Sequence, residues 1–236
     1  NFKNYIRAVY FKTAFFMSKN FPSKEYKENI KFYKKMHREG YKLIDGSKIN
    51  ERDAYDGHST LVFAKLIQDI IKKNQIETML DYGCGKGFFY SNASNQNGIK
   101  INSLKDYWKI DIDLYDPCYE KNSFIDEKKK YDLVISIDVL EHIPSQDTDW
   151  VLEKIISKAK KYVFINVACY SAIAILPNGE NAHINVNEPK WWHEKILKLK
   201  KIYQHVKIIC VCSLKENGKH IFFPLQYDDK ITNYNK

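Results

Sequence analysis

The stretch LDYGCGKGFFY, at residues 80–90, places three glycines at alternate positions directly after a short apolar run. Glycine lets the backbone turn tightly and approach a ligand closely, and nucleotide-binding sheets hold their ligands at the carboxyl ends of their strands. A phosphate-binding loop needs GxxxxGK followed by Ser or Thr, but here Gly87 follows Lys86. A dinucleotide fingerprint is GxGxxG, but Gly83, Gly85 and Gly87 give GxGxG. The loop therefore predicts a nucleotide-like ligand but spells out no pyrophosphate cradle.

Acidic residues follow two further apolar runs. The first run contains Asp111 and Asp113 and reaches Asp116, after which Pro117 would end the strand. The second, YDLVISIDVLEHIP at residues 131–144, changes from apolar to polar at Asp138. A carboxylate offers two acceptor oxygens, so an acid at the end of a strand can accept from two hydrogen-bond donors.

This order of segments resembles the class I S-adenosylmethionine-dependent methyltransferases, over roughly residues 60–225. DxGxGxG is similar to motif I of that family, and YDLVISIDVLEHIP is similar to its fourth strand and following loop. The resemblance implies that the glycine loop wraps the methionine part of the cofactor, with residues Asp81, Gly83, Cys84, Gly85 and Gly87. Asp81 would help to order the amino group of the cofactor. Transfer of the methyl group would convert the cofactor to S-adenosylhomocysteine.

The resemblance also implies an acid on the ribose and a loop beside the methyl group. We favour Asp116 for the ribose, with Asp111 and Asp113 as alternatives, and expect Asp138 and Val139 beside the methyl-transfer site. DPCY, at residues 116–119, is close to the DPPY of amino-methylating nucleic-acid enzymes. That motif follows the fourth strand, a position that DVLEH occupies here, so we interpret DPCY as the ribose-acid turn.

The acceptor is expected near the long connection after the KYVFINV run, because long loops in compact domains are often functional. Transfer to a hydroxyl also removes a proton, and histidine is the natural base near neutral pH. His183 is the first candidate and His142 the second. Candidate acceptor-binding residues are Tyr55, His58, Asn181 and Trp192. No carboxylate–histidine group has convincing metal-ligand spacing along the chain, so the sequence predicts a metal-independent enzyme.

The pattern of elements predicts an α/β fold. Six apolar runs (TMLDY, KIDIDLY, YDLVISI, KYVFINV, VKIICVCSL and HIFFPLQ) are typical of strands, and helices are expected at residues 1–20, 22–40, 61–74, 87–97, 147–160 and 188–203. The family resemblance implies a Rossmann-like, seven-stranded, mostly parallel sheet that ends in an antiparallel hairpin across KENGK. We expect one domain over residues 1–236, with a basic helical cap at residues 1–58 and a core at residues 59–236.

Composition limits the partners. Of the net charge of +9, residues 1–50 carry +8, from 12 Lys and Arg against 4 Asp and Glu. This excess favours an anionic acceptor. Only 3 of the 38 basic residues are Arg, which weakens a nucleic-acid partner because base and phosphate recognition depends on arginine. Five cysteines without a CxxC pair indicate a reduced, cytoplasmic protein, and no apolar run is long enough to span a membrane. The oligomeric state stays open.

A narrower resemblance, in DYGCGKG, YDP, DVLEHIP, PNGENAH and WW, is to methyltransferases of bacterial surface-polysaccharide clusters, including those that decorate capsules with methyl phosphoramidate. It implies O-methylation of a small polar, anionic metabolite that is phosphorylated, nucleotide-linked or a phosphoramidate. One alternative is a nucleic-acid (RNA) methyltransferase that uses the basic helices. Another is a non-catalytic cofactor-binding or scaffold protein.

Overall fold

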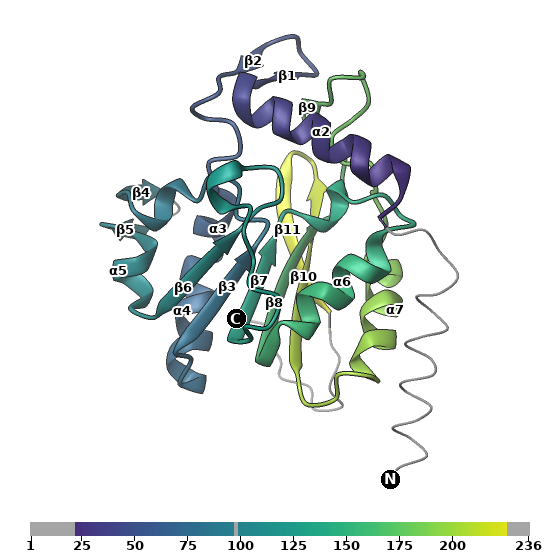
Figure 1. Cartoon of the computed structure of the whole chain (residues 1–236). Coiled ribbons are helices and arrows are strands. Elements are labelled where there is room, and N and C mark those ends of the chain that lie inside the picture. The colour runs from purple at the N-terminus through teal and green to yellow at the C-terminus, as the bar shows by residue number, and fades with distance from the viewer. Residues whose placement is uncertain (1–21, 97–98, 226–236) are drawn as a thin grey trace.

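The computed structural model of the chain describes residues 22–96 and 99–225 (Figure 1). Its main sheet has six strands in the order β11-β10-β8-β7-β3-β6. They are β3 (Thr78–Tyr82), β6 (Asp111–Tyr115), β7 (Tyr131–Ile137), β8 (Ala159–Ala168), β10 (Lys207–Glu216) and β11 (Lys219–Leu225). Neighbouring strands are parallel except for β11, which pairs antiparallel with β10. The six expected strands and the terminal hairpin are confirmed, but this sheet has six strands among the described residues rather than seven.

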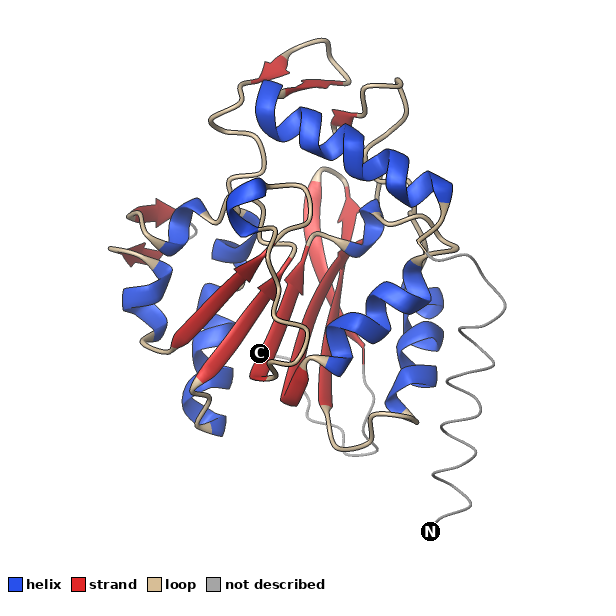
Figure 2. Cartoon of the chain, in the orientation of Figure 1, coloured by secondary structure: helices blue, strands red, loops and turns tan. Residues whose placement is uncertain are grey.

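Helices cover both faces of this sheet (Figure 2). One core cluster packs β-strand side chains against α6 (Thr148–Ser157) and α7 (Pro189–Lys200), and the other packs them against α4 (Ala64–Asn74) and α5 (Leu104–Trp108). Strand β7 serves both, because alternate residues of a strand point to opposite faces: Val134 lies in the first cluster, and Leu133 and Ile135 lie in the second. A sheet buried on both faces explains why its central strands are almost wholly apolar.

The glycine loop does not lead into the helix expected at residues 87–97. It leads into a single 3-10 turn, Phe88–Tyr90, and then into a separate hairpin of β4 (Ser94–Gln96) and β5 (Ile99–Ile101). Phe89 and Tyr90 are buried in the core, whereas the following residues are rich in Ser and Asn, whose side chains compete with helical backbone bonds. Burial of the two aromatics therefore replaces the helix as the support of the loop.

The N-terminal cap contains a helix and a small sheet. Helix α2 (Lys24–Glu39) begins after Ser23, whose hydroxyl accepts from the amide of Tyr26, and ends at Gly40 with φ of 74°. Strands β1 (Tyr41–Leu43) and β2 (Lys48–Ile49) follow, and β1 also pairs with β9 (Ala174–Ile175) from the long connection after β8. The cap therefore contains short strands as well as a helix, whereas the sequence predicts a purely helical cap. The helix expected at residues 1–20 lies outside the described residues.

The cap lies beyond the carboxyl ends of the parallel strands, where α2 crosses above the sheet (Figure 1). Ser23 joins the cap to the core: its backbone amide and its hydroxyl both donate to the Asp147 carboxylate. The helix α3 (Ser59–Val62) connects it to α4. Within the described residues, no helix combines the length and apolar character needed to cross a bilayer, and the five cysteines are free.

Candidate active site

The glycine loop follows β3 and is packed on three sides. Its three glycines have left-handed φ values of 90° at Gly83, 58° at Gly85 and 59° at Gly87. A Cβ on Gly83 would lie 2.3 Å from Cγ2 of Val139, and one on Gly85 would lie 2.3 Å from the carbonyl oxygen of Tyr55. The Gly83 amide also donates to the carbonyl of Tyr115 (2.7 Å). The sequence needs glycine here because backbone conformation and neighbouring atoms both exclude a side chain.

Asp116 joins the end of β6 to this loop. Its Oδ2 accepts from the amide of Gly85 (2.9 Å) and its Oδ1 accepts from the amide of Cys118 (2.7 Å). Asp116 is 8% exposed, and burial raises the pKa of its carboxyl. Each of its oxygens has a further lone pair, so the group can still accept from two ribose hydroxyls.

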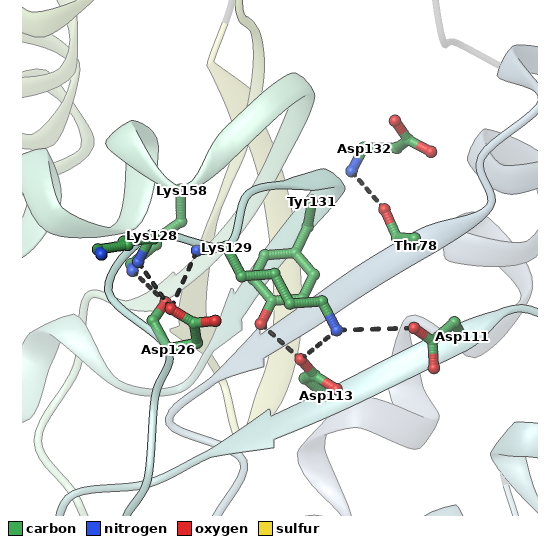
Figure 3. Close-up of polar contacts among 9 residues, drawn as sticks. All are labelled: Thr78, Asp111, Asp113, Asp126, Lys128, Lys129, Tyr131, Asp132 and Lys158. Carbon is green, nitrogen blue, oxygen red and sulfur yellow. Dashed lines mark hydrogen bonds and ion pairs between the residues drawn. The ribbon is translucent and has the colours of Figure 1, made fainter.

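The two alternative ribose acids are paired elsewhere (Figure 3). Nζ of Lys129 lies 3.6 Å from Asp111 and 2.7 Å from Asp113. The hydroxyl of Tyr131 also donates to Asp113 (2.5 Å). These contacts lie further from the carboxyl end of β6 than Asp116, because Asp111 and Asp113 are the first and third residues of that strand. Of the three acids, Asp116 alone has a hydrogen bond to the glycine loop in the described structure.

Asp81, inside β3, is a buried acid directly beneath the loop. Its side chain is 1% exposed, and its Oδ2 accepts from the hydroxyl of Tyr90 (2.7 Å). Burial raises the pKa of Asp81 to about 7, with a further contribution from Asp116 and against the effect of the Tyr90 bond. The carboxyl therefore titrates near neutral pH, and a cationic group placed beside it would favour its charged form.

Two loops, one after β7 and one after β9, bring an acid and two histidines together. Asp138 has a left-handed φ of 60°, which is uncommon for a residue other than glycine. The rings of His142 and His183 are in edge contact, with centroids 4.7 Å apart, although the residues are far apart in the chain. One ligand-type atom from each of Asp138, His142 and His183 lies within 4.8 Å of the other two. Burial, with a contribution from His183, lowers the pKa of His142 to about 4.

Glu141, in the 3-10 turn after β7, is buried beside this group. It is 0% exposed, and its Oε1 accepts from the amide of Ala168 (2.6 Å) at the end of β8. Burial and the charge of Asp138 raise the pKa of Glu141. The opposite holds for Asp138: burial opposes its charge, but interactions with His142, Glu141 and Ser59 outweigh burial and lower its pKa. In this acid–histidine group of Asp138, Glu141, His142 and His183, the pKa of one carboxyl is therefore lowered and that of the other is raised.

The expected acceptor residues are placed differently. Tyr55 packs against the rings of Tyr33 and His37 beside the glycine loop. His58 is exposed, and its hydrogen bond to Asp56 raises its pKa. Both polar atoms of the Asn181 side chain bond backbone, with Oδ1 accepting from the amides of Ala172 and His183. Asn181 therefore fixes the loop that carries His183 rather than presenting groups to an acceptor.

Trp192 lies in the hydrophobic core, away from the acid–histidine group. It is 0% exposed and belongs to the hydrophobic core between α7 and the sheet. Its large side chain fills the core, so the expected contact between Trp192 and the acceptor is wrong.

Three residues without a functional prediction also lie at the site. Tyr33 bonds Nδ1 of His142 (2.7 Å), and Ser59 donates to Asp138 (3.0 Å). Nε2 of His37 lies 4.0 Å from Asp116, but burial lowers the pKa of His37 to about 4, so the two form no ion pair at neutral pH. The helical spacing of Tyr33 and His37 indicates a buried face of α2, but it carries no signal for what that face touches.

Comparison with known proteins adds one finding. A family model described as a methyltransferase domain matches residues 55–215, which include the glycine loop, Asp116 and the acid–histidine group. Neither a curated protein nor a solved structure matched the chain.

Proposed function

The chain belongs to the methyltransferase-domain family, and from its site we propose an enzyme that transfers a methyl group from S-adenosylmethionine to oxygen on a small polar, anionic acceptor. The observation that carries the proposal is the bond from the Gly85 amide to Asp116, which joins the glycine loop to the acid after the neighbouring strand. The loop holds the methionine part of the cofactor, Asp81 faces its amino group, and Asp116 accepts from its ribose. Asp138 and Val139 then border the methyl group.

The acceptor side of the proposal depends on the groups around this edge of the sheet. Asp138, His142 and His183 are the polar side chains gathered there, and they act on the acceptor hydroxyl. Exposed lysines of α2, such as Lys31 and Lys34, favour an anionic acceptor of the phosphorylated, nucleotide-linked or phosphoramidate class. The cytoplasmic steps of surface-polysaccharide biosynthesis would supply such metabolites, and the proposal places the enzyme in those steps.

Ligand-induced stabilisation tests the cofactor. S-adenosylhomocysteine at about 100 times its dissociation constant should add roughly 2.7 kcal/mol to the free energy of unfolding, which is a shift of several degrees for a chain of this size. NAD is the control and should give no shift. The Asp116→Ala variant should lose the shift with S-adenosylhomocysteine. A shift with NAD, or none with S-adenosylhomocysteine, would contradict the proposed cofactor.

Transfer of a labelled methyl group tests the acceptor. Phosphorylated and nucleotide-linked metabolites should accept the label. An RNA oligonucleotide that accepted it while the metabolites did not would favour the nucleic-acid alternative. Cofactor binding without transfer to any of these acceptors would favour the non-catalytic alternative.

A further inference from the structure

The side chains of Asp138, His142 and His183 are arranged like the ligands of one metal ion. Their three ligand-type atoms lie within 4.8 Å of one another. Metal–ligand distances of about 2.0–2.2 Å allow ligand atoms on opposite sides of an ion to be up to about 4.4 Å apart, so a small inward movement would complete a site. The spacing of these residues along the sequence does not indicate a metal site, because His183 comes from the loop after β9, 41 positions beyond His142.

Nδ1 of each imidazole lies within hydrogen-bond distance of a backbone carbonyl, which leaves Nε2 for a metal. Nδ1 of His183 lies 2.6 Å from the carbonyl oxygen of Tyr170, which can only accept, so this nitrogen carries the proton. Nδ1 of His142 lies 3.0 Å from the carbonyl oxygen of Ala182, and the Tyr33 hydroxyl donates to that same oxygen. In each ring Nε2 is left with a free lone pair, as in metal sites where the other ring nitrogen donates to a carbonyl.

The two carboxyl groups add a second, independent observation. Ser59 donates to Oδ2 of Asp138 (3.0 Å) and fixes that carboxylate from the side of α3. Glu141 is wholly buried beside it, and its Oε2 has no well-formed hydrogen bond within the described part of the chain. An unsatisfied buried carboxyl oxygen costs free energy, and a cation at this position would offset that cost.

We propose that Asp138, His142 and His183 bind one divalent transition-metal ion, such as Zn²⁺, Mn²⁺ or Fe²⁺, with Glu141 beside it. Two imidazoles favour these ions over Mg²⁺, which prefers an all-oxygen set. Asp138 and His142 are half-buried rather than closed off, so the ion keeps positions open to an acceptor. The site adjoins the cofactor loop, because Val139 follows Asp138 and packs on Gly83.

The catalytic role of the ion rests on the proposed function. An acceptor hydroxyl bound to the ion loses its proton to solvent more readily, because the ion stabilises the alkoxide. The alkoxide oxygen forms a bond to the methyl carbon, the carbon–sulfur bond breaks, and its electron pair stays on sulfur to give S-adenosylhomocysteine. His183 and His142 are then ligands instead of proton acceptors, which replaces the base role expected from the sequence.

Metal titration of the untagged full chain tests the site without measuring activity. After dialysis against a chelator, Co²⁺ should bind at one ion per chain and give visible absorption bands, and calorimetry with Zn²⁺, Mn²⁺ and Mg²⁺ should rank Mg²⁺ last. Loss of an outer-sphere partner weakens metal binding by about 10–100-fold. His183→Ala and Asp138→Asn change direct ligands, so each should weaken metal binding by more than about 100-fold. His205→Ala, which removes an exposed histidine outside the group, should bind as the wild type does.

Binding of S-adenosylhomocysteine, measured on the same samples, separates the two proposals. A folded wild type that binds S-adenosylhomocysteine but no metal overturns the metal site and leaves the proposed function standing. Metal uptake without S-adenosylhomocysteine binding supports the site and contradicts the proposed cofactor. Equal uptake by the wild type and by folded His183→Ala means an adventitious ion only and overturns the metal site.

Discussion

Under the proposed function, the buried carboxyl of Asp81 links cofactor binding to pH. Its pKa of about 7 in the free protein means that it is protonated through the mildly acidic range, where an exposed Asp is already charged. The ammonium group of the cofactor binds best to the carboxylate. Binding below pH 7 must therefore release the Asp81 proton, and that release weakens the observed affinity.

We predict that the affinity for S-adenosylhomocysteine rises with pH and levels off above about pH 7. Well below that pH the change should approach tenfold per pH unit, since one proton is released per ligand bound. Asp81→Asn keeps the shape of the side chain and cannot titrate, so its affinity should be lower and show no such slope. Calorimetric titrations at a series of pH values measure both. An equal slope in the two proteins would place the proton on another group.

Gly85 tests whether the loop is shaped by close contact or by backbone conformation alone. Gly85→Ala places a Cβ 2.3 Å from the Tyr55 carbonyl oxygen at φ of 58°, whereas Gly179→Ala adds a Cβ at φ of 91° with no atom within 4 Å. The backbone strain of about 1–2 kcal/mol is common to both. Only Gly85→Ala should also displace the loop and abolish S-adenosylhomocysteine binding. Denaturant unfolding and ligand titration of the two variants make the comparison, and intact binding by Gly85→Ala would contradict it.

At the scale of the elements, the sequence predicts those that depend on local patterns. TMLDY and YDLVISI coincide with β3 and β7, and Ser23 and Gly40 bound α2 as expected. The expected helix at residues 87–97 is wrong because the glycine-loop pattern suggested a helix after it, whereas Phe89 and Tyr90 are drawn into the core. Tertiary burial overrode the expected local structure there.

The acid–histidine group was harder to predict because it is assembled from distant segments. Strand β9 is two residues long and exists by pairing with β1, more than 120 residues earlier. That pairing and the bonds of Asn181 place His183 against His142. Spacing along the chain carries no record of such a contact, so the metal-type grouping emerges only from the fold.

Tyr33 connects α2 to the acid–histidine group, and a substitution by Phe removes its hydroxyl alone. Tyr33→Phe loses the contacts to His142 (2.7 Å) and to the Ala182 carbonyl (2.9 Å). We expect a loss of about 1–2 kcal/mol in the free energy of unfolding and a weakening of Co²⁺ binding by roughly tenfold or more. Tyr41→Phe is the matched control, because its hydroxyl has no hydrogen bond in the described structure. Unchanged Co²⁺ affinity in Tyr33→Phe would mean that the hydroxyl supports the cap and not the histidine.

At the scale of the whole molecule, charge and architecture act at the same edge. The six-stranded sheet directs the ends of β3, β6 and β7 toward the cap, whose described residues 22–50 carry a net charge of +4, from 8 Lys and Arg against 4 Asp and Glu. Lys34 acts electrostatically on Cys118, two residues after Asp116, and Lys86 acts on His37. An anion that approaches this edge is therefore attracted by groups on both the cap and the glycine loop.

The salt dependence of catalysis follows from this arrangement. Raising the ionic strength from 0.1 M to 1 M shortens the screening length from about 10 Å to about 3 Å, so kcat/KM for a phosphorylated acceptor should fall. S-adenosylhomocysteine has no net charge, so its affinity should change little over the same range. Lys34→Gln should lower kcat/KM at low salt and converge with the wild type at high salt. Lys65→Gln removes the same charge from exposed α4 and should leave kcat/KM unchanged. If salt had equal effects on the phosphorylated acceptor and on a neutral analogue, the acceptor would not be selected by its negative charge.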